Sequence, residues 1–423
     1  MVYQQPVGTN TWSRLALLFS LSEDRSFQID PYVDTTIDWA RTPDGHTYSN
    51  KPPGPAFLAF PFYAPIDHFL NRNLESREER DRARLRRGWN TQYLLSLLLQ
   101  VLPFVFIACL AFSYLPPDVS LVARSVGLLA LLLGSTASVF MNNFFGHAMT
   151  AWWCLAMCLA TLKDRYRWIG FSYGWLCLCD YTMAPLGLVS LAILRGKGFF
   201  KIVQGGILPG LLWSLYHWKS FGSPFTLANH FQNPAFVDVQ GAGFLGIFHL
   251  LPQPRIVFEL LFGFWRGILW TQPWVLAALV FGALSWNSKT QFRSRLARFS
   301  IASFLILLLI NSAFGGWHGG GSPGPRYLSP IFPVMGLLLT CFYDGLSDFW
   351  KHLLQLGVGA GVCFTLVVLS IELMPPQERL LWPYYADQLF HHFTPTMLFR
   401  LGLGILGLAV GSLYAYISSI KSR

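Results

Sequence analysis

The sequence predicts an all-α fold, a polytopic membrane helix bundle of about eleven spans. Of its 423 residues, 53% are hydrophobic and only 12% are charged, whereas soluble domains carry about 25% charged residues. The apolar residues also fall in long blocks rather than at helix or strand period, and such blocks are typical of membrane spans. So little charge cannot cover the surface of a soluble protein of this length. We therefore expect lipid to be the solvent of most of the chain.

The apolar blocks give the predicted spans in order. The first, residues 91–114, is long enough to cross a bilayer at about 20 residues per crossing. The other predicted spans are 121–141, 147–162, 168–181, 182–195, 202–218, 267–286, 299–314, 327–343, 353–373 and 396–417. The two blocks that meet at Tyr181 are open to a second interpretation, one long tilted helix. We expect two parts, an outer region at 1–90 and a transmembrane domain at 91–423.

Lysine and arginine set the expected orientation. Most of those after residue 90 fall in one alternating set of connections and the C-terminus, and the positive-inside rule makes that set cytoplasmic. The segments expected to face outward are 1–90, 219–266, 315–326 and 375–395. Within the first of these, the proline-containing run 54–70 favours an interfacial or re-entrant helix. The arginine-rich run 72–87 also contains acids, and its simplest interpretation is a solvated amphipathic helix.

Charge and cysteine usage exclude several classes of protein. The net charge of +10 comes mostly from short clusters between apolar blocks, whereas nucleic-acid binding needs a contiguous basic face. We expect no nucleic-acid partner. All seven cysteines lie inside apolar blocks, where free cysteine behaves as a small hydrophobe. A disulfide framework or zinc site is therefore not expected. Residues 1–50 are mixed and polar, without the apolar region of a signal peptide.

One outer segment, residues 30–55, is rich in groups that serve chemistry. It concentrates Asp30, Asp34, Asp38 and Asp44, and it ends with Lys51 before two prolines. Because proline fixes the backbone, the Lys51 ammonium can be held at a defined height near the membrane. A phosphate at the level of the lipid headgroups would be its natural partner. The alternative is a polar loop whose lysine snorkels to the interface.

A second outer segment, the glycine-rich run 315–328, contains Arg326 at the start of a predicted span. Glycine allows close backbone approach and positive φ. An arginine at that depth needs a partner, and a phosphate held by two hydrogen bonds would serve. The alternative is an ordinary tight loop in which Arg326 anchors the topology.

Two further polar groups lie at predicted span ends. His147 follows Asn142 and Asn143, and its side chain could contact a ligand or cap a helix. Asp180 lies between two apolar runs, and an ionisable residue at membrane depth is a functional candidate. If those runs are separate helices, Asp180 would instead lie at the outer turn.

In order along the chain, four motifs resemble those of GT-C fold glycosyltransferases, above all bacterial relatives of protein O-mannosyltransferases and of aminoarabinose lipid A transferases. The first outer loop contains DW at 38–39 and ends in YSNKPPG at 48–54, like the Tyr-x-x-Lys-Pro-Pro motif of that family. The others are FFGHA at 144–148, FGSPF at 221–225 and GPRYL at 324–328. The resemblance covers residues 10–345.

The chain departs from the pattern of this family in two ways. Such proteins normally begin with a membrane helix, and they place an acid near the start of the loop, where this chain has Asn10, Thr11 and Trp12.

The resemblance implies a glycosyltransferase that uses a polyprenyl-phosphate sugar donor and releases polyprenyl phosphate on the non-cytoplasmic face. Its acceptor would be a lipid, a glycan or a protein, and its place the bacterial inner membrane with a periplasmic site. No cofactor is certain, and a divalent metal is left open. By position, Lys51 and Arg326 would hold the donor phosphate, with Arg14 and Tyr48 as second candidates. His147 and Tyr327 complete the expected substrate-binding residues. The acceptor hydroxyl needs a general base, for which Asp38 is the first choice and Asp34 the second.

Two other functions compete with this one. A transporter or lipid flippase usually shows repeated halves and ionisable residues near the midplane, whereas no repeat is visible here and the polar motifs gather on one side. A non-catalytic relative would fit the absent first helix and loop acid.

Overall fold

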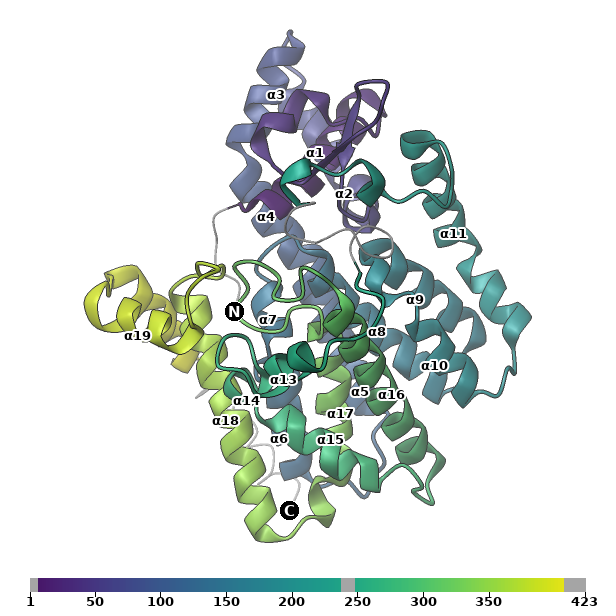
Figure 1. Ribbon diagram of the computed structural model, residues 1–423, viewed down its shortest axis with the longest axis vertical. Coiled ribbons are helices and arrows are strands. Elements are labelled where there is room, and N and C mark those ends of the chain that lie inside the picture. Colours follow the sequence, from purple (N-terminus) through teal and green to yellow (C-terminus); the bar gives the residue numbers. More distant parts are fainter. Residues whose placement is uncertain (1–6, 237–247, 407–423) are drawn as a thin grey trace.

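The computed structural model describes residues 7–236 and 248–406 (Figure 1). Helices make up most of this part of the chain, which confirms the all-α class. Within the described residues, the strands β1 (Trp39–Arg41) and β2 (Thr47–Ser49) form a two-stranded antiparallel hairpin.

The outer region is built on a helix that the sequence did not predict. Residues 9–24, expected as mixed polar chain, form α1 (Thr9–Asp24), and its apolar run from Leu15 to Phe19 is fully buried. The short η1 (Asp30–Thr35) and the hairpin follow, then α2 (Gly54–Asn71) and α3 (Arg77–Arg86). Helices α1 and α2 pack on each other, and with α3 they lie together at the top of Figure 1.

The arginine-rich run is anchored rather than merely solvated. Ser76 and Glu79 form a capping box at the start of α3. Arg84 is almost fully buried, and its guanidinium contacts Glu23 at 2.5 Å, Asp67 at 2.8 Å and Asp81 at 3.0 Å. We call the set Glu23, Asp67, Asp81, Arg80 and Arg84 the acid–arginine network, since Arg80 also pairs with Glu23 at 2.7 Å. It ties α1, α2 and α3 together.

Helix α2 carries an apolar stripe on its exposed side. Phe62, Ile66 and Phe69 recur at helical spacing, and each is about half exposed or more. The opposite side buries Tyr63 and Asp67. A helix that packs one side on its own protein and leaves an apolar stripe exposed is suited to lie at an interface between water and lipid.

Every predicted span within the described residues coincides with helix, although several helices are shorter than a full crossing. Helix α4 (Gly88–Ser96), a π-helical turn η2 (Leu97–Val101) and α5 (Leu102–Ser113) form one continuous helix. The following elements are α6 (Leu121–Leu132), α7 (Thr136–Phe140), α8 (Gly146–Leu162), α9 (Tyr166–Cys179), η3 (Tyr181–Met183), α10 (Leu186–Ile193), α11 (Phe199–Phe221), η4 (Ala228–Phe231), α13 (Pro254–Phe262), α14 (Ile268–Thr271), α15 (Trp274–Leu284), α16 (Gln291–Ala313), η5 (Ser329–Ile331), α17 (Phe332–Phe342), η6 (Tyr343–Gly345), α18 (Asp348–Ser370) and α19 (Leu381–His391). The last predicted span, 396–417, lies only partly within the described residues.

Three helices in the described ranges are long and apolar enough to cross a membrane by themselves. They are Gly88–Ser113, Gln291–Ala313 and Asp348–Ser370. This supports the membrane character of the chain, and the count of eleven spans stays a prediction.

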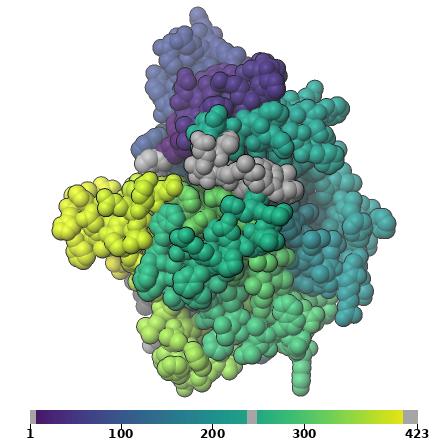
Figure 2. Space-filling view, viewed as in Figure 1, coloured from purple at the N-terminus to yellow at the C-terminus, as the bar shows by residue number. Residues whose placement is uncertain are grey.

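Helices α8 and α17 form the centre of the bundle. Both are buried along nearly their whole length, as expected for helices that are apolar on all sides. Helix α8 packs on α5, α9 and α17, and α17 packs on α6, α15 and α16. In the space-filling view the outer region rises above this bundle, and α19 projects from its side (Figure 2).

The block around Tyr181 is two helices, so the interpretation as one long helix is wrong. Helix α9 ends at Cys179, and Asp180 has extended backbone. The Asp180 carboxylate accepts hydrogen bonds from Thr182, which begins the next turn. Asp180 nevertheless stays buried, because its position at the end of α9 is covered by the outer region.

Candidate functional site

The hairpin brings Asp38 and Lys51 together. Trp39 pairs with Ser49 at the open end of the ladder, and the backbone N–H of Asn50 donates to the carbonyl of Asp38. The residues just outside the ladder are therefore neighbours. The Lys51 Nζ lies 2.7 Å from Asp38 Oδ1, and both side chains are mostly buried. Asp38, predicted as the general base, is thus held in an ion pair.

Two glycines seat this loop on the end of α9. An added Cβ at Gly54, where α2 begins, would lie 2.6 Å from the carbonyl of Leu178. One at Gly146, where α8 begins, would lie 2.3 Å from the carbonyl oxygen of Cys179. Only glycine allows backbones to approach so closely. The glycines after Lys51 and before His147 therefore bring both motifs to Asp180.

Arg14 reaches the same place from α1. Its guanidinium Nη2 lies 3.1 Å from where a Cβ of Gly146 would be. Nη1 donates to the backbone carbonyl of Asn10 at 3.0 Å and to the Asn10 side-chain oxygen. Its Nε is buried without a partner. Burial lowers the pKa of Arg14 to about 10, opposed by Asp38 and Asp180, so the group stays cationic at neutral pH.

His147 contacts Asp180 rather than capping α8. Its Nδ1 lies 2.9 Å from Asp180 Oδ2. The other carboxylate oxygen of Asp180 accepts from the N–H and hydroxyl of Thr182 at 3.0 and 2.8 Å. The imidazole and the Tyr327 ring are perpendicular, with centroids 5.1 Å apart. Asp180 is therefore placed to orient the His147 ring.

The glycine-rich loop wraps around Arg326. Gly319 has φ +72°, and a Cβ there would lie 2.8 Å from Arg326 Nε, so the expected need for glycine is met at this position. Arg326 Nη2 donates to the Tyr327 hydroxyl at 2.9 Å. Its Nε is buried without a partner, and within the described residues Arg326 forms no ion pair with a carboxylate. Its guanidinium also lies over the Tyr327 ring, 4.9 Å from the centroid, so its contacts leave it without a negatively charged partner.

Arg14, Lys51 and Arg326, which we call the cation cluster, are close enough to act on one another electrostatically. Burial lowers the pKa of Lys51, Asp38 opposes that effect, and the positive charges of Arg14 and Arg326 lower the pKa further. Lys51 in turn lowers the pKa of Asp38 against the effect of burial. Three segments far apart in the chain thus bring three cations to one place, where they outnumber the carboxylates of Asp38 and Asp180, and the excess positive charge would attract an anion.

Two of the predicted site residues lie outside this cluster. Asp34 is exposed on η1. Tyr48 is buried against Phe221, with ring centroids 5.5 Å apart. The other two acids of this loop stabilise the hairpin. Asp30 accepts a hydrogen bond from the N–H of Thr47 at 2.8 Å, and Asp44 accepts one from the Thr42 hydroxyl.

One buried cation near the site was not predicted. Arg266 is 1% exposed, and its guanidinium donates to the carbonyls of Trp265, Arg379, Gln377 and Gly320. It therefore joins the glycine-rich loop to the loops around Trp265 and Gln377. In sequence Arg266 is an isolated arginine before an apolar block, without any motif that marks this role.

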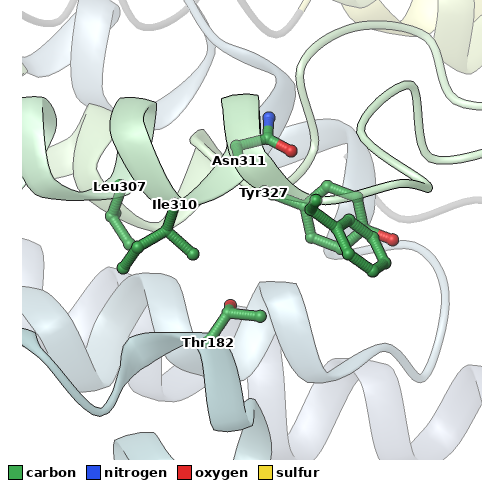
Figure 3. A pocket seen from close by; sticks show the side chains of 6 residues that line it. Thr182, Leu307, Ile310, Asn311 and Tyr327 are labelled. Atoms are coloured by element: carbon green, nitrogen blue, oxygen red, sulfur yellow. The ribbon is translucent and has the colours of Figure 1, made fainter. Parts of the chain in front are cut away.

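A small apolar pocket of about 10 Å³ lies beside Tyr327 (Figure 3). Thr182 closes one side, and Leu307, Ile310 and Asn311 of α16 close the other. The volume suffices for about one water molecule, so no sugar fits there. Across the described ranges, no group of three or more His, Cys, Asp or Glu side chains could hold a metal ion.

No family model matches the chain, and no curated protein or solved structure is significantly similar to it. The link to GT-C fold glycosyltransferases therefore depends on the motifs, and the function on the geometry of the site.

Proposed function

We propose that the protein is a membrane glycosyltransferase that moves a sugar from a polyprenyl-phosphate donor to an acceptor on the non-cytoplasmic face. The observation that carries this proposal is the convergence of Arg14, Lys51 and Arg326, cations from three distant segments. Buried cations with unused donors are costly to keep. An anionic ligand that takes those donors accounts for them.

A phosphate diester at the headgroup level fits the donors that are left over. Arg14 Nε and Arg326 Nε are buried N–H groups without partners. Charge-assisted hydrogen bonds from arginine to phosphate are strong and directional. As the sugar is transferred, the departing polyprenyl phosphate gains negative charge, and cations fixed beside it stabilise the transition state.

The ion pair between Lys51 and Asp38 suggests how a base is released. Without donor, the carboxylate faces the ammonium at 2.7 Å and its pKa is lowered, so it is a weak base. When donor phosphate engages Lys51, the pKa of Asp38 rises and the carboxylate can accept the acceptor's hydroxyl proton. The acceptor oxygen then bonds to the anomeric carbon, the bond from that carbon to the phosphate oxygen breaks, and polyprenyl phosphate leaves with the electron pair.

His147 and Tyr327 are assigned to the sugar. Both lie beside Arg326, and Asp180 fixes the orientation of His147. Aromatic and imidazole groups beside a phosphate site are suited to contact a pyranose or furanose ring. The apolar stripe of α2 would lie in the outer interface of a bacterial inner membrane, which holds the loop where a lipid phosphate arrives.

The first test is binding of polyprenyl phosphate, the product shared by all such donors, to the purified full-length protein. Lys51→Ala and Arg326→Ala should each weaken binding, and turnover with a polyprenyl-phosphate sugar should fall by roughly 100-fold or more. Lys289→Ala is the matched control, because Lys289 is exposed on the predicted cytoplasmic side.

Thermal unfolding separates function from folding in this test. Arg326→Ala should keep the unfolding temperature of the parent protein, because Arg326 has no carboxylate partner within the described residues. Lys51→Ala should lower it, because Asp38 then stays buried without its partner, so binding by this variant is measured below its unfolding temperature. Unchanged affinity and turnover in both variants would refute the phosphate site. Transport of the lipid across vesicles, without sugar transfer, would favour the flippase instead.

A further inference from the structure

A large apolar groove lies between α10 and α11, with α9 as its floor. It encloses about 710 Å³, within the usual range of ligand sites. Apolar side chains and glycines line it, among them Tyr173, Leu188, Leu191, Val203, Ile207 and Gly210. The three helices lie side by side on the right of Figure 1. The groove is separate from the cation cluster.

The groove stays open because α10 does not pack along α11. Helix α11 packs closely on α9, since Gly170 and Gly205 allow backbone contact with Ile202 and Arg167. A Cβ added at Gly210 would meet nothing within 4 Å. In a bilayer such a space takes an apolar chain, because no buried polar group there would hold water.

One end of the groove, which we call its inner mouth, is strongly basic. Helices α9 and α11 begin and α10 ends there. Five exposed cations surround these helix ends: Arg165, Arg167, Arg195, Lys197 and Lys201. The acid that the sequence places among them, Asp164, pairs with Arg295 at 2.9 Å. The N-termini of two helices add to the attraction for an anion.

The opposite end is closed by polar groups that already have partners. Tyr181 and His217 are hydrogen-bonded at 3.0 Å, and the indole N–H of Trp213 donates to the carbonyl of Pro224 at 2.9 Å. Tyr181 and Trp213 also contact edge to face. A lipid headgroup therefore finds free charge at the inner mouth, not here.

We propose that this groove binds one acyl chain of an anionic phospholipid from the cytoplasmic leaflet, with its phosphate against Arg167, Lys197 and Lys201. The positive-inside rule places these cations on the cytoplasmic side. From Phe199 to Trp213 the groove wall rises by about 21 Å at about 1.5 Å per residue. That length exceeds half of a hydrocarbon core about 30 Å thick. The site does not depend on the proposed sugar transfer.

The test is thermal unfolding of the full-length protein in uncharged detergent, with added phosphatidylglycerol or phosphatidylcholine. Phosphatidylglycerol should raise the unfolding temperature, whereas phosphatidylcholine and inorganic phosphate should leave it unchanged. The double variant Lys197→Gln, Lys201→Gln should bind phosphatidylglycerol roughly tenfold or more weakly. Lys289→Gln, an exposed cation on the same side, should behave like the parent.

Gly210→Leu tests the groove itself by filling it. It should abolish stabilisation by phosphatidylglycerol, whereas Gly359→Leu should not. Gly359 is the matched control, because it is exposed on α18 and a Cβ there also meets nothing within 4 Å. Equal stabilisation by phosphatidylcholine, or by phosphate alone, would overturn the proposal. So would a Gly210→Leu variant that keeps phosphatidylglycerol but loses polyprenyl phosphate, because the groove would then belong to the donor.

Discussion

The acid–arginine network of the outer region and the cation cluster are both groups of buried charge, yet they differ in how completely the charges are paired. In the network, Arg84 contacts three carboxylates and Asp67 also accepts from Tyr63 and Asn71. In the cation cluster, Arg326 contacts no carboxylate within the described residues. The Nε atoms of Arg14 and Arg326, the two arginines of this cluster, are buried without hydrogen-bond partners.

This difference separates a structural role from a binding role. A saturated network holds helices together and has nothing left to offer a ligand. An unsaturated one costs stability, and a protein keeps it where a ligand completes the pairing. Mutations in the two regions should therefore affect different measurements.

The largest effect on stability is expected from Arg84→Ala. Removing the guanidinium leaves Glu23, Asp67 and Asp81 buried beside one another without their shared partner. Breaking a buried pair in this way costs about 3–5 kcal/mol. Chemical unfolding of the purified protein measures it. Arg82→Ala on the same helix is the control, because its exposed pair with Glu78 should contribute less than about 1 kcal/mol. Equal losses from the two variants would contradict a structural role for the network.

A smaller loss of stability, but a large loss of function, is expected from Gly146→Ala. The new methyl group would meet the Cys179 carbonyl at 2.3 Å and the Arg14 guanidinium at 3.1 Å. Such overpacking costs about 1–3 kcal/mol, and it displaces Arg14 from the site. Binding of polyprenyl phosphate should fall together with stability. Full binding in a folded Gly146→Ala protein would show that Arg14 takes no part.

How far the sequence predicted these regions also differs. Lys51 and Arg326 were predicted because prolines or glycines beside them mark special backbone, and His147 because it lies at a predicted span end after Asn142 and Asn143. The partner of His147 was not predicted, because the contact with Asp180 depends on how the end of α9 meets the start of α8. Helix α1 was missed because its apolar run is short and flanked by polar residues. Only its packing against α2 makes it a buried helix.

Asp38 shows most clearly what the sequence alone could not predict. Its place in the loop predicted a base, but strand register decides that it faces Lys51. Pairing across a hairpin depends on where the turn falls. The sequence therefore predicted the residue types of the site better than their state of charge.

Asp38→Asn should reduce function, and it should also reduce stability, because the buried Lys51 loses its ion-pair partner. Asparagine keeps the shape but removes the charge that opposes the burial of Lys51, so the pKa of Lys51 should fall further below its ordinary value. Turnover should drop, because no carboxylate remains to accept the proton. Binding of polyprenyl phosphate should hold or strengthen at neutral pH, because the competing anion is gone. Turnover equal to that of the parent would exclude Asp38 as the base and direct attention to His147.

The smallest effect is a pH dependence that distinguishes the cations of the cluster. Burial, with repulsion from Arg14 and Arg326, lowers the pKa of Lys51 in the folded protein. The folded state therefore binds fewer protons than the unfolded state between that pKa and the ordinary value of 10.5. The free energy of unfolding should rise with pH across this window. Binding of polyprenyl phosphate should do the opposite, because the phosphate requires the ammonium and is itself fully ionised well above a pKa of about 6.

Lys51→Arg isolates this effect, because the guanidinium keeps its charge through the same window. In the parent protein, affinity measured from pH 8 upward should decline as Lys51 loses its proton, and in Lys51→Arg the decline should move to higher pH. If both proteins lost affinity at the same pH, the titrating group would be Arg14, whose pKa is lowered to about 10. Lys51 would then serve to neutralise Asp38, and the phosphate would be held by the two arginines.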